Sequence, residues 1–258
     1  MKTSNKLLLV FFLAMFFSAA SLMVYAKSHM VVGKEGMEEY HYGEDAIVIE
    51  RTLLDNLTIS NLEMGDNFKY IIDPTRTDVT VKGDSAFVSK LTVVHDNQFR
   101  ILTGGVGHNF NWPDNLLVVV GVKNLDKLDL DINGNARVTA NQPLEYDSIK
   151  MYMEGNSKFL ADLTVNNLEV KSNGNSGLTL NGNTIDLKAY SNGNSKLNFE
   201  NCEISSAKLD LNGNAKFYGD TVGSLTGHAN GNAKVTFNEV TGNQNTSANG
   251  NARFTIRN

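Results

Sequence analysis

The sequence contains few cysteines, which could cross-link the fold, and few prolines, which would interrupt its secondary structure. It contains one cysteine, Cys202, among 258 residues, which excludes an intramolecular disulfide framework and is typical of a small buried side chain. Only three prolines occur, and only one tryptophan, Trp112. The five histidines show no metal-ligand spacing, and no motif for a metal, a cofactor or a catalytic nucleophile is present, so the sequence predicts none of these sites and no enzyme.

An excess of positive charge is also absent. The chain has 23 basic and 28 acidic residues and a formal net charge of −5. A mildly acidic chain is a poor ligand for nucleic acid or for an anionic membrane surface, and the sequence predicts neither as a partner.

Residues 1–26 are typical of an export signal. Lys2 and Lys6 precede the apolar run Leu7–Phe17, and small residues lead to a cleavage site after Ala26. An uncleaved anchor is the alternative, because residues 7–26 are about long enough to span a bilayer. We expect cleavage, a leader over residues 27–45, and one β-domain over residues 46–258.

The abundant feature is a regularly spaced Gly-Asn pair. Seven copies follow one another at intervals of 18 to 21 residues. This period indicates stacked repeats that are too small to fold singly. The glycines of the repeat are Gly134, Gly155, Gly174, Gly193, Gly213, Gly231 and Gly250.

Residues on both sides of each pair alternate between apolar and polar, so a strand enters a bend at Gly-Asn and a second strand leaves it. A meander of antiparallel hairpins would satisfy this pattern. A parallel coil also explains why the copies are identical, because stacked asparagines hydrogen-bond along a column. We therefore predict an all-β, right-handed parallel β-helix with coils of about 19–20 residues, regular over residues 125–258 and irregular over 46–124.

A family resemblance supports this fold. The similar residues are Leu57–Ile59, Val79–Asp84, Leu91–Ile101, Leu116–Val120, Leu125–Leu128 and Gly134–Ala136. With these residues the chain resembles the auto-transporter adhesin family with a head GIN domain, which occurs as exported proteins of Bacteroidetes-type bacteria. The resemblance implies a β-helix related to pectate-lyase-like solenoids and a place in the periplasm, outer membrane or cell surface of a Gram-negative bacterium. It supplies no catalytic residues.

The position three residues after each repeat glycine is a cation in six of seven copies, with Gly177 as the exception. Alternation points these side chains outward, either as a solvated ladder or as a strip that binds an acidic polymer. Trp112 lies in a glycine-rich segment, where it could stack on a sugar or could plug the core. The candidate ligand-binding residues are Arg137, Lys158, Lys196, Lys216, Lys234, Arg253 and Trp112.

Acidic residues show no matching column, and calcium-type repeats would need aspartate after the glycines. We therefore expect a non-enzymatic, adhesin-like or envelope-scaffolding β-helix that binds glycans or other cell-surface polymers. A polysaccharide lyase or hydrolase on the same solenoid is the alternative. The last repeat strand, residues 253–258, leaves an open edge, which predicts a homo-oligomer or a partner at this coil.

Overall fold

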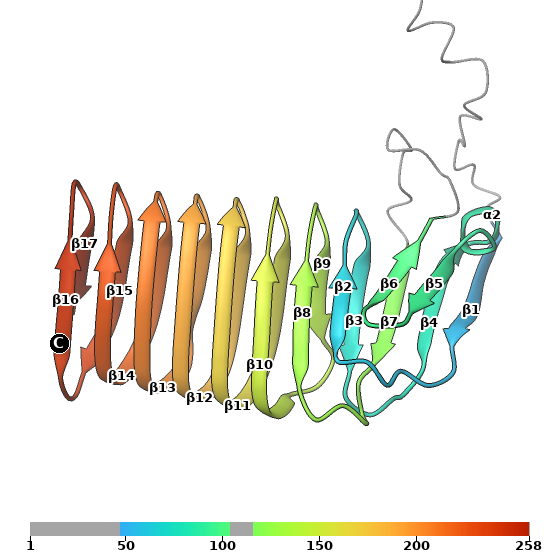
Figure 1. Ribbon diagram of the computed structural model, residues 1–258, viewed down its shortest axis with the longest axis horizontal. Helices are drawn as coiled ribbons and strands as arrows, with labels where there is room; N and C mark the ends of the chain where they lie inside the picture. Colours follow the sequence, from blue (N-terminus) through green and yellow to red (C-terminus); the bar gives the residue numbers. More distant parts are fainter. Residues whose placement is uncertain (1–46, 104–115, 258) are drawn as a thin grey trace, which may run out of the picture. The chain divides into compact units, whose positions relative to one another are not determined.

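The computed structural model describes residues 47–103 and 116–257, all within the compact unit Asp45–Asn258. The predicted signal, the leader and Trp112 lie outside the described residues. The described chain forms a β-solenoid of about seven turns, and the all-β prediction is confirmed (Figure 1). Its regular strands are β8 (Leu128–Ile132), β9 (Arg137–Ala140), β10 (Leu144–Met153), β11 (Lys158–Gly174), β12 (Gly177–Gly193), β13 (Lys196–Gly213), β14 (Lys216–Ala229), β15 (Lys234–Val240), β16 (Gln244–Ala248) and β17 (Arg253–Ile256).

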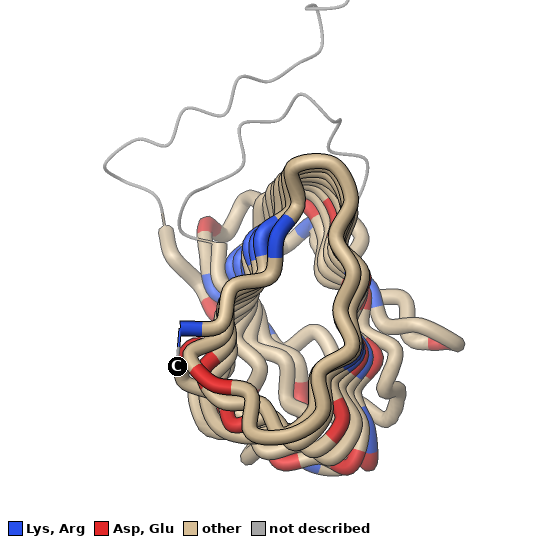
Figure 2. The backbone as a smooth tube through the Cα atoms, turned by 90° about the vertical axis from the view of Figure 1, so that its left-hand side faces the viewer, with Lys and Arg blue, Asp and Glu red and all other residues tan. Residues whose placement is uncertain are grey.

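Consecutive coils pair in parallel, with each residue beside its counterpart one repeat earlier. Gly174 aligns with Gly193, and Gly193 aligns with Gly213. The parallel coil is thus confirmed over the hairpin meander. The long strands β11 to β13 continue around the wide end of the coil, whereas every coil bends sharply at its Gly-Asn corner (Figure 2).

The corner requires glycine for two reasons. All seven repeat glycines have φ between 66° and 107°, a region that side chains other than glycine rarely adopt. In the six copies from Gly155 onward, a Cβ atom would lie 2.7 to 3.1 Å from the carbonyl oxygen of the preceding repeat glycine. At the corners, therefore, the backbone of each coil lies directly against the backbone of the preceding coil, with no room for a side chain at the glycine.

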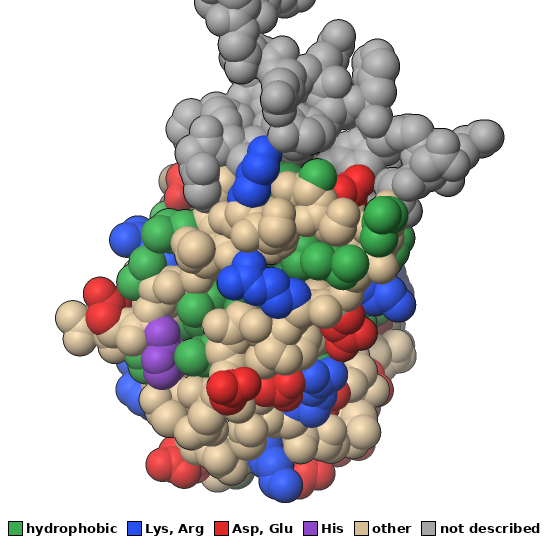
Figure 3. All heavy atoms as spheres, turned by 90° about the vertical axis from the view of Figure 1, so that its right-hand side faces the viewer, with side chains coloured by type: hydrophobic (Ala, Val, Ile, Leu, Met, Phe, Trp, Pro, Cys, Tyr) green, Lys and Arg blue, Asp and Glu red, His purple; other side chains and the backbone are tan. Residues whose placement is uncertain are grey.

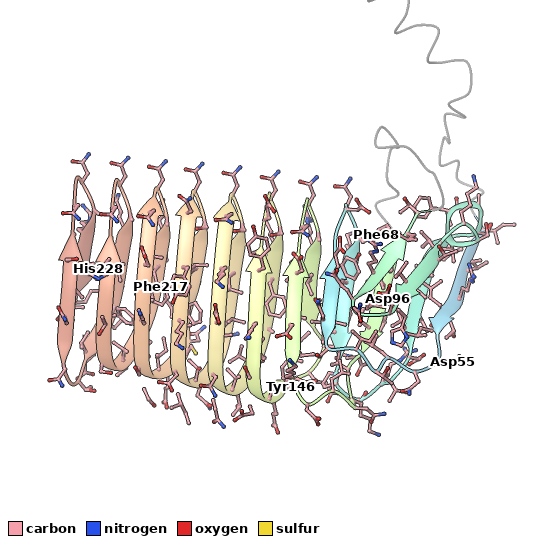
Figure 4. All side chains as sticks on the ribbon, in the orientation of Figure 1. Asp55, Phe68, Asp96, Tyr146, Phe217 and His228 are labelled. Atoms are coloured by element: carbon pink, nitrogen blue, oxygen red, sulfur yellow. The ribbon has the colours of Figure 1, made fainter. Side chains whose placement is uncertain are left out.

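The asparagine ladder runs along this corner, where one side chain projects from each coil (Figure 4). Each amide nitrogen donates to the amide oxygen of the preceding coil at 2.7 to 3.1 Å. The ladder has one member that we did not predict, Asn67, because Asp66 stands in the place of the repeat glycine and has φ of 61°. Its members are Asn67, Asn135, Asn156, Asn175, Asn194, Asn214, Asn232 and Asn251.

Apolar columns fill the space between the two walls of the solenoid. Phe199, Phe217 and Phe237 stack on successive coils with ring centroids 5.1 and 5.2 Å apart (Figure 4). Cys202 is buried, as predicted, and burial raises the pKa of its thiol to about 12. The interior of the described solenoid thus resembles a packed core.

The N-terminal end departs from the order of the chain. β2 (Asn61–Met64) and β3 (Lys69–Asp73) form a coil that stacks directly on β8 and β9. On its other side lie β6 (Phe99–Leu102) and β7 (Leu117–Gly121), so the chain from β7 to β8 passes over an intervening coil.

Antiparallel strands cover this end of the stack. β4 (Val79–Asp84) pairs with β7 and with β1 (Val48–Leu54), and β5 (Thr92–His95) pairs with β6. The short helix α2 (Ser85–Val88) buries Phe87 and Val88, and Arg51 Nη1 donates to three carbonyl oxygens at its C-terminal side. Seen from this end, hydrophobic side chains alternate with charged and other polar ones (Figure 3). Among the described residues, no helix has the length and hydrophobicity to cross a membrane.

Candidate functional site

The predicted cations lie in one column, interrupted once at Gly177, on the strands that leave the corner. The register places Arg137 beside Lys158, then Gly177 as a gap, then Lys196, Lys216, Lys234 and Arg253. Viewed along the stack, these basic residues lie as a row beside the narrow corner of the coil (Figure 2). We call this row the cation column.

Lys69 extends the cation column by one coil, because it pairs with Arg137. We did not predict this member from the sequence. A signal was nevertheless present, since Asn67-Phe68-Lys69 has the same spacing as Asn135-Ala136-Arg137.

The side chains of the cation column face solvent. Five of the six predicted cations are exposed, and Lys234 is half-buried. Lys196 has a fixed neighbour, because its Nζ lies 5.4 Å from the centroid of the Tyr218 ring. The ion pairs Arg76–Asp78, Lys127–Asp129 and Lys171–Glu169 include none of these six cations.

The columns on either side of the cations carry no charge. On one side stands the asparagine ladder. On the other side the register aligns residues 139, 160, 179, 198, 218, 236 and 255, which are Thr, Leu, Thr, Asn, Tyr, Thr and Thr. The next acids on this wall are Asp162, Glu200 and Asp220, of which Asp162 and Asp220 each accept a hydrogen bond from an asparagine at 2.7 Å. The two columns beside the six predicted cations therefore contain no carboxylate.

The other wall, built by strands that enter the corner, has mixed charge and a shallow depression. The depression has a volume of about 230 Å³ and is floored by the buried residues Leu130 and Met151. Its polar side chains come from β2, β8, β10 and β11, which are neighbours in the stack. They are Asn61, Asp129, Asp131, Lys150, Tyr152, Glu169 and Lys171.

The groups of the depression hold one another in place. Lys171 Nζ lies 2.8 Å from Glu169 Oε1, and this contact lowers the pKa of Glu169 and raises that of Lys171. Asp129 pairs with Lys127 at 3.3 Å, so two of the three acids of the depression are in ion pairs. Partial burial raises the pKa of Asp131, to which repulsion by Glu154 adds.

Nothing in the described part of the chain resembles a metal centre, since no group of three potential ligands comes together there. The acids of the depression, two on β8 and one on β11, are interleaved with lysines. The arrangement is an open surface of mixed charge on a stack of paired strands.

The described residues thus define a parallel β-solenoid whose polar and charged columns are repeated along its outer walls. The chain belongs to the family described as "Putative auto-transporter adhesin, head GIN domain", which matches residues 60–257. No curated protein sequence matches the chain.

Solved structures from Bacteroides and Parabacteroides species have the same fold. A putative adhesin from Bacteroides fragilis is 15% identical with a TM-score of 0.70, and the match covers 83% of this chain and 98% of that one. A putative adhesin from Parabacteroides merdae is 12% identical with a TM-score of 0.63, covering 83% and 97%. A putative lipid binding protein from Parabacteroides distasonis is 13% identical with a TM-score of 0.59, covering 83% and 98%. At these identities the likeness establishes the fold alone.

Proposed function

We propose that this domain is a non-enzymatic, adhesin-like module of the cell envelope that binds an acidic cell-surface polymer along the cation column. The observation that carries the proposal is the alignment of six cations at coil spacing, without a carboxylate partner, between two uncharged columns. Family membership supports the adhesin-like role and a location outside the cytoplasm.

Spacing favours a polymer over a small anion. Adjacent coils are about 4.8 Å apart, so the cations form a line and do not converge on one point. Neighbouring unit charges at about 5 Å repel by under about 1 kcal/mol in water, so the fold tolerates the column without a ligand. A chain of carboxylates or sulfates laid along the column would replace this repulsion by attraction over its whole length.

Polygalacturonate is a suitable probe, because it is a linear acidic polysaccharide. We expect the domain to bind it at low ionic strength and to lose affinity steadily as salt is added. Calorimetric titration over a salt series measures both. The proposal would be wrong if no binding occurred at the lowest salt concentration, or if affinity did not change with salt.

Filling the gap in the column should strengthen this binding. Gly177 has a φ outside the left-handed region, and an added Cβ would meet only Lys158 Cγ, at 3.8 Å, so a side chain fits without strain. We expect Gly177→Lys to raise affinity for polygalacturonate about fivefold, for about 1 kcal/mol per added cation. Gly177→Ser is the uncharged control and should leave affinity unchanged. Equal affinities of the two variants would indicate that the cations of the column are only solvated and do not bind the polymer.

We also propose that a second copy of this chain contacts the last coil. Among the described residues, β16 and β17 pair on one side only, with β14 and β15. Phe254 and Ile256 of β17 pack against the core but remain half-buried at this end. A second copy would continue the sheet and cover both side chains.

Sedimentation velocity over a concentration series tests this contact. We expect association that weakens in Ile256→Lys, which places a charge at the uncovered end of the core, and persists in Thr255→Lys, whose side chain points outward. A wild-type protein that stays monomeric at high concentration would contradict the proposal.

A further inference from the structure

The depression on the wall opposite the cation column has the chemistry of a second binding site. From the mixture of its side chains we propose that it binds a neutral saccharide chain. This inference is independent of the acidic polymer proposed for the cation column, because it rests on different strands and different residues.

The charges of the depression select against charged ligands. Asp129, Asp131 and Glu169 would repel a polyanion. Lys150 and Lys171 would repel a polycation. An uncharged ligand rich in hydroxyl groups suits both sets. Each sugar hydroxyl both donates and accepts a hydrogen bond, and here carboxylate and amide oxygens accept while ammonium and amide N–H groups donate.

Tyrosines supply the apolar part of such a site. Tyr152 lines the depression and exposes 36% of its surface, which is unusual for a large aromatic side chain in this protein. Its hydroxyl accepts a hydrogen bond from Asn173 Nδ2 at 3.1 Å, which anchors the edge of the ring to the next coil. A ring held at its edge can present a flat apolar surface to the C–H face of a sugar ring.

The same outward column contains a second tyrosine. By register Tyr152 is followed by Lys171 and then by Tyr190, so the two rings stand two coils, or about 10 Å, apart. Lys171 lies between them, with its Nζ 6.0 Å from the centroid of Tyr190 and in contact with Glu169. The series Tyr152, Lys171 and Tyr190 runs along the stack, and it therefore fits a linear ligand of several sugar units.

The floor and the neighbouring strands make the site rigid. Leu130 and Met151 are each 2% exposed, and the strands that carry them pair in unbroken register. The polar groups therefore keep their spacing before a ligand arrives, which lowers the entropy cost of binding.

Three neutral hexasaccharides, xylohexaose, cellohexaose and maltohexaose, serve as probes for the full chain. We expect at least one to bind in a calorimetric titration, with an affinity that does not change with salt. Tyr152→Ala should weaken binding about tenfold, since an aromatic stacking contact contributes about 1 kcal/mol or more. Tyr152→Phe keeps the ring but loses the hydrogen bond from Asn173, so its affinity should lie between those of the wild type and Tyr152→Ala.

Tyr218→Ala is the matched control, because Tyr218 stands on the other wall beside Lys196. It should leave the affinity for the hexasaccharide unchanged. Unchanged thermal midpoints in all three variants would show that the fold is intact. The inference fails if none of the three probes binds, or if Tyr152→Ala and Tyr218→Ala lower the affinity equally.

Discussion

Replacing Lys196, Lys216 and Lys234 together by glutamate is expected to abolish binding of polygalacturonate at low salt. The three residues are consecutive members of the cation column, paired coil to coil. Each cation near an anionic surface contributes about 1 kcal/mol, so removal of three weakens binding by at least about 100-fold. The new carboxylates add repulsion to this loss.

A control with the same change in net charge separates the column from a general charge effect. Lys123, Lys188 and Lys208 are exposed and lie outside the column. Their replacement by glutamate should weaken binding only through the long-range field, which salt screens within about 10 Å at 0.1 M. Titrations of both triple variants at the same salt concentration make the comparison. Equal losses would show that net charge, and not the column, determines binding.

Gly182→Ala is expected to lower the free energy of unfolding by about 3 kcal/mol or more. Gly182 has a φ of 109°, and an added Cβ would lie 2.0 Å from the carbonyl oxygen of Leu163 on the adjacent coil. A residue forced into such a conformation costs about 1–3 kcal/mol. The contact cannot be relieved by a rotamer change, because the obstructing atom belongs to the backbone, so the strand must also move.

Gly177→Ala on the same strand is the comparison. Its backbone is not left-handed and its surroundings are open. Alanine should therefore stabilise this strand position slightly, by about 0.5–1 kcal/mol relative to glycine. Urea denaturation followed by circular dichroism measures both changes. If Gly182→Ala unfolded at the same urea concentration as the wild type, the close backbone approach at the wide end of the coil would be wrong.

The repeated half of the fold could be predicted from the sequence because parallel stacking rewards identical residues. An asparagine stabilises its neighbours only if the next coil carries one too, so the Gly-Asn pair returns at every corner. Alignment on the same glycines located the cation column, which lies three residues beyond the glycine in six of the seven copies. Register then follows directly from the spacing of the glycines.

The N-terminal end could not be predicted in this way. Its cap pairs antiparallel strands whose residues do not repeat, such as Val81 with Val118. The first corner uses Asp66 in place of glycine, and its asparagine, Asn67, bonds to a residue 68 positions away. A motif search aligned on Gly-Asn therefore begins one coil too late and misses Lys69.

The depression on the other wall could not be predicted from the sequence either, for a related reason. Asn61 belongs to β2, and it pairs with Asp129 of β8 although 68 residues separate them in the sequence. The two strands are neighbours because β6 and β7 lie on the other side of β2 and β3. Tyr152, Lys171 and Tyr190 share a column, but their side chains differ in type, so no repeat signal marks them. A column whose residues differ in type produces no repeat in the sequence by which it could be predicted.

Lysine footprinting tests the central claim most directly, because it reports where a polyanion lies on the solenoid. The protein is acetylated with and without polygalacturonate, and modification of each lysine is measured by mass spectrometry. The cation column predicts that Lys158, Lys196, Lys216 and Lys234 are protected by the polymer, while Lys188 and Lys208 react as before. Equal protection on both walls, or none on the column, would contradict the account.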